Sequence, residues 1–329
     1  MGIALIALGA AGHHAISQWL EQNYAPVGTG TTGIVEVPPG TGTGGIASIL
    51  KDEQRIPDET AFKVGVWWWK LSGKLKAGHY RISPEMTPKE IAELIASGKE
   101  ATVKLTIPEG FTAVQIAERV AAAGLCSVEE FLAAAVPATV AELELGSDEY
   151  DSLEGYLFPA TYVITFGATP DDVVLQMTDA FMKRIAAPMA EGFEAGGRTR
   201  HEMITIASLI EREARVEKDR ALISAVIHNR VKKGMRLDID ATVLYALGEH
   251  KDVITREDLR IDSPFNTRRY KGIPPHPIAS PGEASVRAAL NPASVDYLFY
   301  VAKPDGSHVF TRTNAEHERA KRAIREGRI

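Results

Sequence analysis

A degenerate repeat is the feature that most limits how the first part of this chain can fold. One copy runs from Pro38 to an Ile-Ala pair at position 46, and another runs from Pro108 to an Ile-Ala pair at position 116. A third copy, Thr87–Glu93, matches Thr112–Glu118. Each copy combines a strand or turn, a residue of the helix-capping type and a short amphipathic helix that begins on its Ile-Ala pair. The repeat therefore predicts short helices that follow short strands or turns.

The glycines of Gly40–Gly45 fall inside one copy and resemble a phosphate-binding loop. This segment lacks the Lys-Ser/Thr ending that reaches phosphates and Mg²⁺ in such loops. The other copies carry no glycine cluster at the same place. We therefore interpret Gly40–Gly45 as a loop that leads into a helix and not as a nucleotide site.

Composition disfavours several classes of protein. With 329 residues, 45% of them hydrophobic and 24% charged, the chain can form two domains, or one domain with an elaboration, around a sizeable core. The net charge of −6 and the pI of about 5.9 argue against a nucleic-acid partner, since proteins that bind nucleic acid are usually basic. The single cysteine, Cys126, excludes an intrachain disulfide and any metal site built of several cysteines.

The N-terminus is compatible with two interpretations. Met1–Gly12 is an uncharged apolar run that His13 and His14 interrupt. A membrane-spanning helix needs about 20 apolar residues, and a complete signal peptide would have a basic start and a cleavage site. The run is therefore either the end of a membrane anchor whose beginning is missing or a buried helix. Ala25–Gly33, rich in Gly, Thr and Pro, follows as a linker.

A helix predicted over Met203–Ala214 places one carboxylate on its apolar side. Ile204, Ala207, Glu211 and Ala214 recur at helical spacing and share one face. A carboxyl group held against apolar surface resists ionisation, so it stays protonated near neutral pH and can donate that proton. A glycosidic oxygen needs such a donor when its bond breaks. Glu211 is therefore the candidate general acid.

A structural interpretation of Glu211 is also open. Arg215 follows it by four residues, which is the favourable order for an ion pair along one helix. On helical geometry alone, such a salt bridge is the more frequent role for a carboxylate. Glu213 and Glu217 lie off the apolar stripe, and we expect both to face solvent.

Three consecutive tryptophans, Trp67–Trp69, cannot all face one way on a strand or a helix. We expect at least one of them to be exposed or to lie at a domain interface. Tryptophan faces suit sugar rings, but core packing is the more frequent explanation.

Further elements are predicted along the second half. Strands are expected at 102–107 and 161–165, and Tyr297–Ala302 and Ser307–Thr311 are expected to form a hairpin. The spacing predicts helices at 171–185, 220–233 and 283–290. The sequence from Ile254 onward is rich in residues typical of turns. A long irregular segment of this kind more often lines a functional site than serves only as a connection.

The sequence offers little other chemistry. It has no HExxH zinc motif and no GxSxG motif, and its nine histidines are scattered, with His308 and His317 too isolated to define a site. The polar candidates in the irregular segments are Asp238, Asp240, Asn266 and Tyr270. What remains is carboxylate chemistry at Glu211.

Five motifs occur in an order that resembles a known family. They are EGYLFPATY at 154–162, IASLIEREA at 206–214, HNRVKKGMRLDIDATVLYALG at 228–248, SPFNTRRYKGIPPHPIASPG at 263–282 and NPASVDYLFYVA at 291–302. In this order they resemble the YceG-like family, the endolytic murein transglycosylases called MltG. The resemblance extends from about Val35 to near the C-terminus. His276 is a departure, since the family more often has glycine there.

The resemblance implies an α+β fold in three parts. Residues 1–30 would be the apolar segment and linker, 31–100 a LysM-like subdomain and 101–329 a mixed α/β catalytic domain. It also implies a cell-envelope protein, held in the plasma (inner) membrane by a single N-terminal span if that anchor is complete, with the catalytic domain on the periplasmic or extracytoplasmic side. The implied partners are peptidoglycan glycan strands and peptidoglycan synthases, with no nucleic acid. Neither a metal nor an organic cofactor is implied.

The resemblance aligns Glu211 with the family's catalytic glutamate. We expect Glu211 to protonate the leaving oxygen when the β-1,4 bond between N-acetylmuramic acid and N-acetylglucosamine breaks inside a strand. Its carboxylate would then take the proton of the muramyl C6 hydroxyl, which closes onto C1 as a 1,6-anhydro ring. Because the substrate supplies the nucleophile, no second carboxylate of the enzyme is required. Asp240, Asn266 and Tyr270 lie in matching motifs and are candidates for substrate hydrogen bonds, with turn stabilisation as the alternative.

Two other functions stay open. A non-catalytic peptidoglycan-binding envelope protein would make its contacts through the repeat units and keep Glu211 paired with Arg215. A muramidase would use water in place of the C6 hydroxyl. The product distinguishes the three functions. A binding protein yields no product, a muramidase yields a reducing end, and a lytic transglycosylase yields an anhydro end.

Overall fold

The computed structural model of the protein describes residues 14–15, 17–19, 23–139, 152–195, 197–249, 251 and 253–329. Met1–Gly12, for which an anchor or a buried helix is predicted, lies outside these residues. In the part of the chain that is described, no helix has both the length and the apolar character to cross a bilayer. The chain divides into two compact units, residues 1–103 with 163–167 and residues 104–162 with 168–329.

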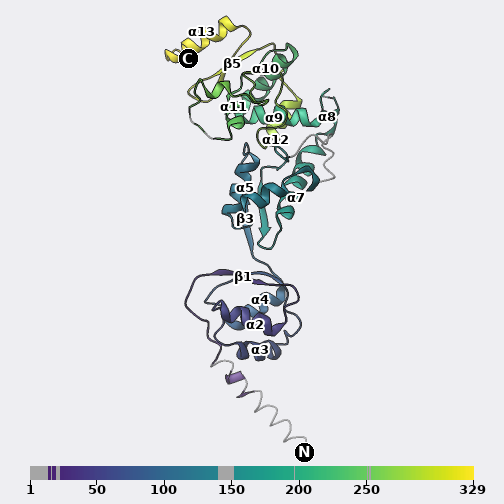
Figure 1. Ribbon diagram of the computed structural model, residues 1–329, viewed down its shortest axis with the longest axis vertical. Helices are drawn as coiled ribbons and strands as arrows, with labels where there is room; N and C mark the ends of the chain where they lie inside the picture. Colours follow the sequence, from purple (N-terminus) through teal and green to yellow (C-terminus); the bar gives the residue numbers. More distant parts are fainter. Residues whose placement is uncertain are drawn as a thin grey trace, which may run out of the picture. The chain divides into compact units, whose positions relative to one another are not determined.

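Between residues 33 and 97, the first unit combines a two-stranded sheet with three helices. Strands β1 (Gly33–Val37) and β2 (Gly78–Ile82) pair antiparallel, and alternate residues of each strand face the core. Helices α2 (Thr43–Asp52), α3 (Glu59–Trp68) and α4 (Pro88–Ser97) gather beside β1 (Figure 1). Their apolar faces and the sheet enclose one continuous cluster of buried side chains.

The repeat of the sequence produces the same local structure three times. The Ile-Ala pairs that begin at positions 46, 91 and 116 are all buried, on α2, α4 and α5 (Ala113–Ala122). Thr87 and Thr112 cap their helices, and each forms a reciprocal capping box with the residue three positions on. Gly42 is the N-cap of α2 without a side-chain hydrogen bond. Gly40–Gly42 thus lead into the helix as expected, whereas Thr43–Gly45 already form its first turn.

The three tryptophans lie at the end of α3. Trp67 is 64% exposed, in agreement with the prediction that one of them is not in the core. Trp69 follows the helix and packs edge-on against Tyr24, with ring centroids 5.1 Å apart. Trp19, the fourth tryptophan of the chain, also belongs to the first unit.

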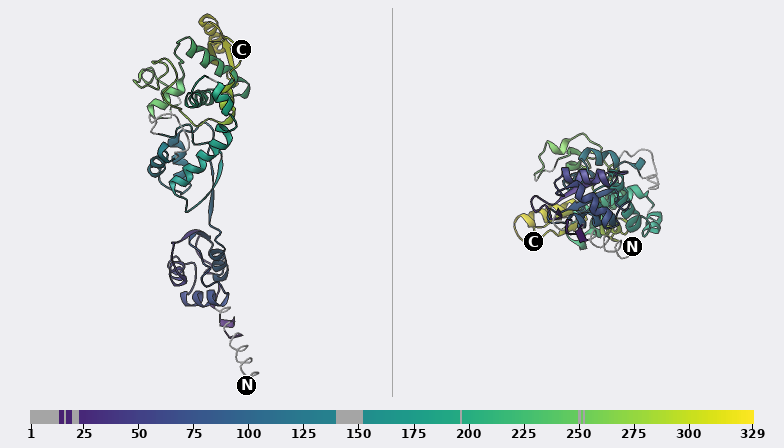
Figure 2. Two further views of the ribbon diagram at one scale, coloured as in Figure 1. Left: turned by 90° about the vertical axis from the view of Figure 1, so that its right-hand side faces the viewer. Right: turned by 90° about the horizontal axis from the view of Figure 1, so that it is seen from below.

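The second unit is mostly helical. Strands β3 (Thr102–Thr106) and β4 (Thr161–Thr165) form one sheet, and β5 (Phe299–Ala302) and β6 (His308–Thr311) form the predicted hairpin. Residues 104–106 of β3 and 161–162 of β4 belong to this unit, and the remaining residues of the two strands belong to the first unit. Within the second unit, the C-terminal helix and its part of β3 lie at opposite ends (Figures 1 and 2). Besides α5, the helices are α6 (Val128–Ala134), α7 (Pro170–Phe181), α8 (Ala190–Ala195), α9 (Arg200–Glu213), α10 (Arg220–Lys232), α11 (Asp240–Leu247), α12 (Glu283–Leu290) and α13 (Asn314–Arg325).

Helix α9 is the centre of the second unit. Its residues from Met203 to Ile210 are all buried, and α10, α11 and α12 pack around it (Figure 1). The predicted helices 220–233 and 283–290 correspond to α10 and α12. The helix predicted at 171–185 is α7, which passes into a π-helical turn, η2 (Met182–Ala186). The prediction of an α+β fold is confirmed.

Candidate active site

An irregular segment, Pro275–Gly282, runs along α9 and is tied to it at three points. The contacts join His201 Nε2 to Pro275 O (3.1 Å), Ile278 N to Ser208 Oγ (3.1 Å) and Gly282 N to Glu211 Oε2 (3.0 Å). They follow α9 from its first turn to its last. This part of the turn-rich sequence, Pro275–Gly282, therefore lies along the helix and is called the wall below. Glu211 lies at the end of the wall, beside Gly282.

A second motif closes on the same wall. Gly155 adopts φ +87°, and a Cβ there would lie 2.5 Å from Pro277 Cβ and 3.3 Å from Ile204 Cγ2. Only glycine combines this backbone conformation with so close an approach. Three of the motifs singled out in the sequence, beginning at Glu154, Ile206 and Ser263, thus meet around α9.

The Glu211 carboxylate is held by one of its two oxygens. The side chain is 8% exposed, and Oε2 accepts hydrogen bonds from Gly282 N (3.0 Å) and Arg220 Nη1 (3.3 Å). Arg220 also donates to Glu217 Oε2 at 2.9 Å and to Ser285 Oγ. Oε1 accepts no hydrogen bond from the described residues. One oxygen is therefore fixed, and the other is available to a bound molecule.

These contacts correct two expectations. The apolar stripe of α9 exists, but the carboxylate of Glu211 faces a guanidinium and a backbone N–H instead of apolar side chains. Its guanidinium partner is Arg220, from the next helix, and not Arg215. Periodicity identified the buried side of α9, but it cannot specify which groups of another segment lie opposite the last turn.

Glu109 brings a second carboxylate to Gly282. The loop before α5 pairs with the wall, since Gly110 N donates to Ser280 O (2.9 Å) and Ser280 N donates to Phe111 O (2.8 Å). A Cβ at Gly282 would collide with the Glu109 carboxylate, so the absence of a side chain there makes room for it. Burial, followed by the charge of Glu211, raises the pKa of Glu109, and Arg220 opposes that rise.

Sequence reasoning missed Glu109. The available signal was a difference between the repeat copies, because Pro108-Glu109-Gly110 carries a carboxylate where Pro38-Pro39-Gly40 has proline. Gly40 and Gly110 both adopt φ +78°. The two loops therefore have the same φ at this glycine and differ in the residue that precedes it. A second carboxylate therefore lies close to Gly282, although the proposed reaction does not require it.

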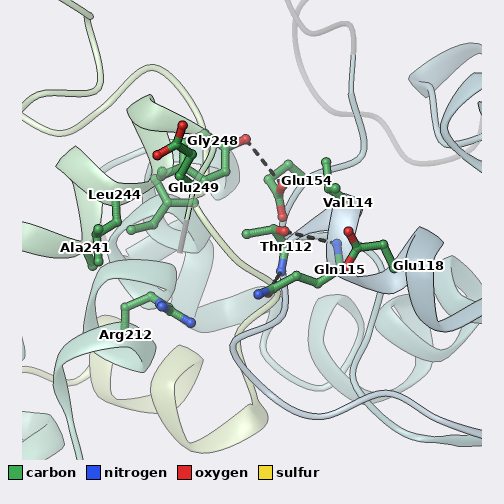
Figure 3. Close-up of a pocket in the computed structure, with 12 residues that line it drawn as sticks. Thr112, Val114, Gln115, Glu118, Glu154, Arg212, Ala241, Leu244, Gly248 and Glu249 are labelled. Carbon is green, nitrogen blue, oxygen red and sulfur yellow. Dashed lines mark hydrogen bonds between the residues drawn. The ribbon is translucent and has the colours of Figure 1, made fainter. Parts of the chain in front are cut away.

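A pocket of about 420 Å³ in the second unit is lined by Arg212, the chain neighbour of Glu211, while Glu211 itself is not among its lining residues (Figure 3). Residues of α5, with Thr112, form one wall, and residues of α11, with Gly248 and Glu249, form the facing wall. Arg212, the neighbour of Glu211, reaches across from α9 and donates to Gly110 O at 3.0 Å. The lining mixes apolar side chains such as Leu244 with charged and hydrogen-bonding groups, including Arg212 and Glu249, which can bind the hydroxyl groups of a polar ligand.

Glu154 lies at the base of this pocket and is only 4% exposed. Ala113 N lies 3.1 and 3.0 Å from its two oxygens, and Tyr245 OH donates to Oε2 at 3.3 Å. Burial nevertheless dominates and raises the pKa of Glu154 to about 7. This carboxylate joins the start of α5 to α11 and so holds the two walls together.

Glu213 does not face solvent, and that prediction is wrong. Tyr300 OH, from β5, donates to Glu213 Oε2 at 2.8 Å, and burial raises the pKa of Glu213. Glu217, in contrast, is 77% exposed as predicted. The hairpin is tied further to the start of α10, because His308 Nδ1 lies 2.9 Å from Asp219 Oδ2 and both side chains are 4% exposed.

The other candidate residues lie outside the immediate surroundings of Glu211. Asp240 begins α11 and pairs with Arg268 at 2.5 Å. Tyr270 is 43% exposed and donates to Asp262 Oδ1 at 2.6 Å. Asp238 pairs with Arg230 at 3.1 Å.

Asn266 is fully buried, and its amide is used by its own loop. Nδ2 donates to Leu259 O (3.1 Å) and Ile261 O (2.9 Å), while Oδ1 accepts from Arg268 N (3.0 Å). This is the turn-stabilising alternative for Asn266. In the part of the chain that is described, no group of three or more His, Cys, Asp or Glu side chains could hold a metal ion.

Comparison with known proteins gives consistent matches. A sequence model of the YceG-like family matches residues 35–323. The chain is 36% identical over 308 residues to the endolytic murein transglycosylase of Bacillus subtilis (strain 168), a match that covers 88% of this chain and 84% of the relative. A crystal structure of a YceG-like protein from Listeria monocytogenes aligns with a TM-score of 0.62 and 35% identity, over 88% of this chain and 98% of that one.

A relative from Streptococcus pneumoniae (serotype 2, strain D39) is longer. It is also named endolytic murein transglycosylase and is 32% identical over 275 residues, which are 74% of this chain and 50% of the relative. The chain therefore matches about half the length of that protein.

Proposed function

The chain belongs to the YceG-like family, and we propose that it is an endolytic peptidoglycan lytic transglycosylase. It would cleave the β-1,4 bond between N-acetylmuramic acid and N-acetylglucosamine within glycan strands and leave 1,6-anhydro ends. The names of the relatives support peptidoglycan as the substrate and the cell envelope as the place of action. The observation that carries the proposal is Glu211, a nearly buried carboxylate with one oxygen held and one free, whose chain neighbour Arg212 lines a pocket.

The reaction uses Glu211 twice. In its protonated form it donates the proton from Oε1 to the leaving oxygen as positive charge develops at C1. Its carboxylate then accepts the proton of the C6 hydroxyl while that oxygen bonds to C1. Positioned acid–base catalysis of this kind contributes typically about 10²–10⁴-fold to a rate.

The groups around Oε2 assist the first step. Negative charge appears on Glu211 as its proton leaves, and a guanidinium and a backbone N–H already point at the oxygen that shares this charge. Donors aimed at a charge that develops in the transition state lower the barrier without reorganisation. Arg220 and Gly282 N–H would therefore stabilise the transition state more than the protonated resting form.

The pocket would hold the sugar residues next to the cleaved bond. Asp240 and Tyr270 remain proposals for contacts further along the strand, while Asn266 would act through its loop. We retain the assignment of residues 31–100 as a LysM-like subdomain and of 101–329 as the catalytic domain as part of this proposal, together with peptidoglycan synthases as partners and a membrane anchor at the N-terminus.

The experiment is product analysis with Glu211→Gln. Purified wild type and variant are incubated with isolated glycan strands, and the new ends are identified by mass spectrometry. Gln is close in shape and keeps an acceptor for Gly282 N–H, so we expect a folded protein whose rate falls at least about 100-fold. Glu194→Gln is the matched control, since Glu194 is an exposed carboxylate on α8.

The outcomes separate the proposal from its alternatives. Anhydro ends from the wild type and almost none from Glu211→Gln support the proposal. Reducing ends would indicate a muramidase, and an inactive but glycan-binding wild type would indicate a binding protein. A Glu211→Gln protein as active as wild type would remove Glu211 from the mechanism.

A further inference from the structure

Two carboxylates of the second unit meet at a single glycine. Gly282 N donates to Glu211 Oε2 at 3.0 Å, and the Glu109 carboxylate occupies the space where a side chain of residue 282 would lie. Glu109 and Glu211 therefore approach the same residue from different segments. Burial, and after it the charge of Glu211, raises the pKa of Glu109.

The position of Glu109 is fixed by its backbone. Gly110 and Phe111 exchange hydrogen bonds with Ser280 in both directions, at 2.9 and 2.8 Å. A Cβ at Gly110 would lie 3.7 Å from Glu211 Cγ, so the loop itself packs against the acid. The backbone of this loop therefore places Glu109 beside Gly282, while much of the Glu109 side chain stays exposed.

The charges that surround this pair come from four elements. Arg220 from α10 contacts Glu211 directly and also lowers the pKa of Glu109. Glu217 from η3 (Glu217–Asp219) raises the pKa of Glu109, and Arg184 from η2 lowers it. Helix α9 contributes Glu211 and also Arg212, whose Nη1 donates to Gly110 O at 3.0 Å, beside Glu109. One guanidinium in contact with Glu211 is thus opposed by the neighbouring carboxylate of Glu109.

We propose that Glu109 is a positioning residue that shares one proton with Glu211 and keeps that proton available to the substrate. The inference rests on the proposed function, because it concerns the protonation of the same general acid. Arg220 and Gly282 N–H favour the ionised form of Glu211, which cannot protonate a leaving oxygen. The negative charge of Glu109 opposes them, since two adjacent carboxylates do not ionise together easily.

The proton balance closes over one cycle. The pair begins with one proton, and Glu211 donates it to the leaving oxygen. Both carboxylates are then charged until the C6 hydroxyl gives its proton to Glu211. The pair ends as it began, with no net exchange of protons with solvent, while one C–O bond has broken and another has formed.

The decisive variant is Glu109→Gln, measured as the pH profile of kcat/KM on isolated glycan strands. Removal of the neighbouring negative charge makes Glu211 easier to ionise, so its protonated fraction falls at any given pH. We expect the basic limb to move about one unit toward lower pH, with about a tenfold loss of rate above it. At acidic pH the rates of the two proteins should agree within about twofold.

A second variant changes no charge. Gly282→Ala introduces a Cβ where the Glu109 carboxylate lies, and φ −76° and ψ 167° at this position are open to alanine. We expect Gly282→Ala to displace Glu109 and to move the basic limb in the same direction. The double variant should show no shift beyond that of Glu109→Gln, because both changes remove the same interaction. Glu194→Gln should leave the profile unchanged.

The results are distinguishable from a failure of the proposed function. A folded Glu109→Gln protein whose profile superimposes on wild type overturns the inference, and so does a loss of rate that is equal at all pH values. If Glu211→Gln is inactive in the same assay, the proposed function survives either result. If Glu211→Gln retains activity, the proposed function is contradicted, and the inference that rests on it is contradicted as well.

Discussion

Glu154 shows how one buried side chain can make stability depend on pH. Burial raises its pKa to about 7 from an ordinary value of 4.5. In the unfolded chain the carboxyl ionises from about pH 4.5 upward, whereas in the folded protein it stays protonated until about pH 7. The free energy of unfolding therefore falls as pH rises through this window and does not fall further above it.

We predict that Glu154→Gln removes this dependence. The shift corresponds to about 3 kcal/mol, as an order of magnitude, because one pKa unit is worth about 1.4 kcal/mol. Thermal melts at about pH 5 and about pH 8 should show the Tm of the variant rising relative to wild type at the higher pH. Glu118→Gln, at an exposed carboxylate on the same pocket, is the control and should show no such change. An equal difference at both pH values would contradict the prediction.

Single residues also show which features of the site could be predicted from the sequence and which could not. Glu211 could be predicted, because its position on the apolar side of α9 follows from local spacing. Its partners could not, since Arg220, Gly282 and Glu109 come from three other segments, and the packing of those segments has no local signal. The same limit explains Glu213, which is covered by Tyr300 from a strand far along the chain.

At the scale of elements, one serine supplies the middle of the three hydrogen-bonded contacts between α9 and the segment Pro275–Gly282. Ser208 Oγ accepts from Ile278 N at 3.1 Å and donates to Thr205 O at 2.7 Å, and the side chain is fully buried. This contact lies between the two ends at which His201 and Glu211 hold the segment. Loss of the acceptor would leave a backbone N–H unpaired in the interior.

We predict that Ser208→Ala lowers the free energy of unfolding by about 1–3 kcal/mol, as measured by chemical denaturation. Ser224→Ala is the matched control, since Ser224 is an equally buried serine on the adjacent α10 whose Oγ has no hydrogen-bond partner among the described residues. Its removal should be neutral or slightly stabilising. Equal losses for the two variants would show that the contact with Ile278 contributes nothing specific.

Elements with strong local signals were predictable, and α3 was not. Capping residues and Ile-Ala pairs identified α4 and α5 because those signals lie within a few residues. In α3, Gly65 and the aromatic and β-branched residues disfavour a helix on their own. The helix forms because Asp58 caps it and because Gly65 lets Trp69 and Tyr24 approach its backbone, a tertiary contact that no local pattern encodes.

At the scale of the molecule, the division into two units predicts two unfolding transitions. Each unit has its own buried side chains, and small units with separate cores need not unfold together. The assignment of the first unit as LysM-like stays a prediction. Its stability, however, can be changed separately from that of the second unit.

We predict that Phe62→Ala, at a fully buried position on α3, costs the first unit about 3–5 kcal/mol and leaves the second unit unchanged. Far-UV circular dichroism during urea unfolding should show an early transition that moves to lower urea and a later one that stays in place. A single transition that moves as a whole would mean that the two units unfold cooperatively.

The location of the tryptophans makes this division directly visible. All four belong to the first unit, so intrinsic indole fluorescence excited near 295 nm reports on that unit and is silent about the helices around Glu211. An emission spectrum can therefore remain native while the catalytic unit has unfolded. Quenching of that emission by glycan fragments would, in turn, identify ligand contacts made by the N-terminal part of the chain.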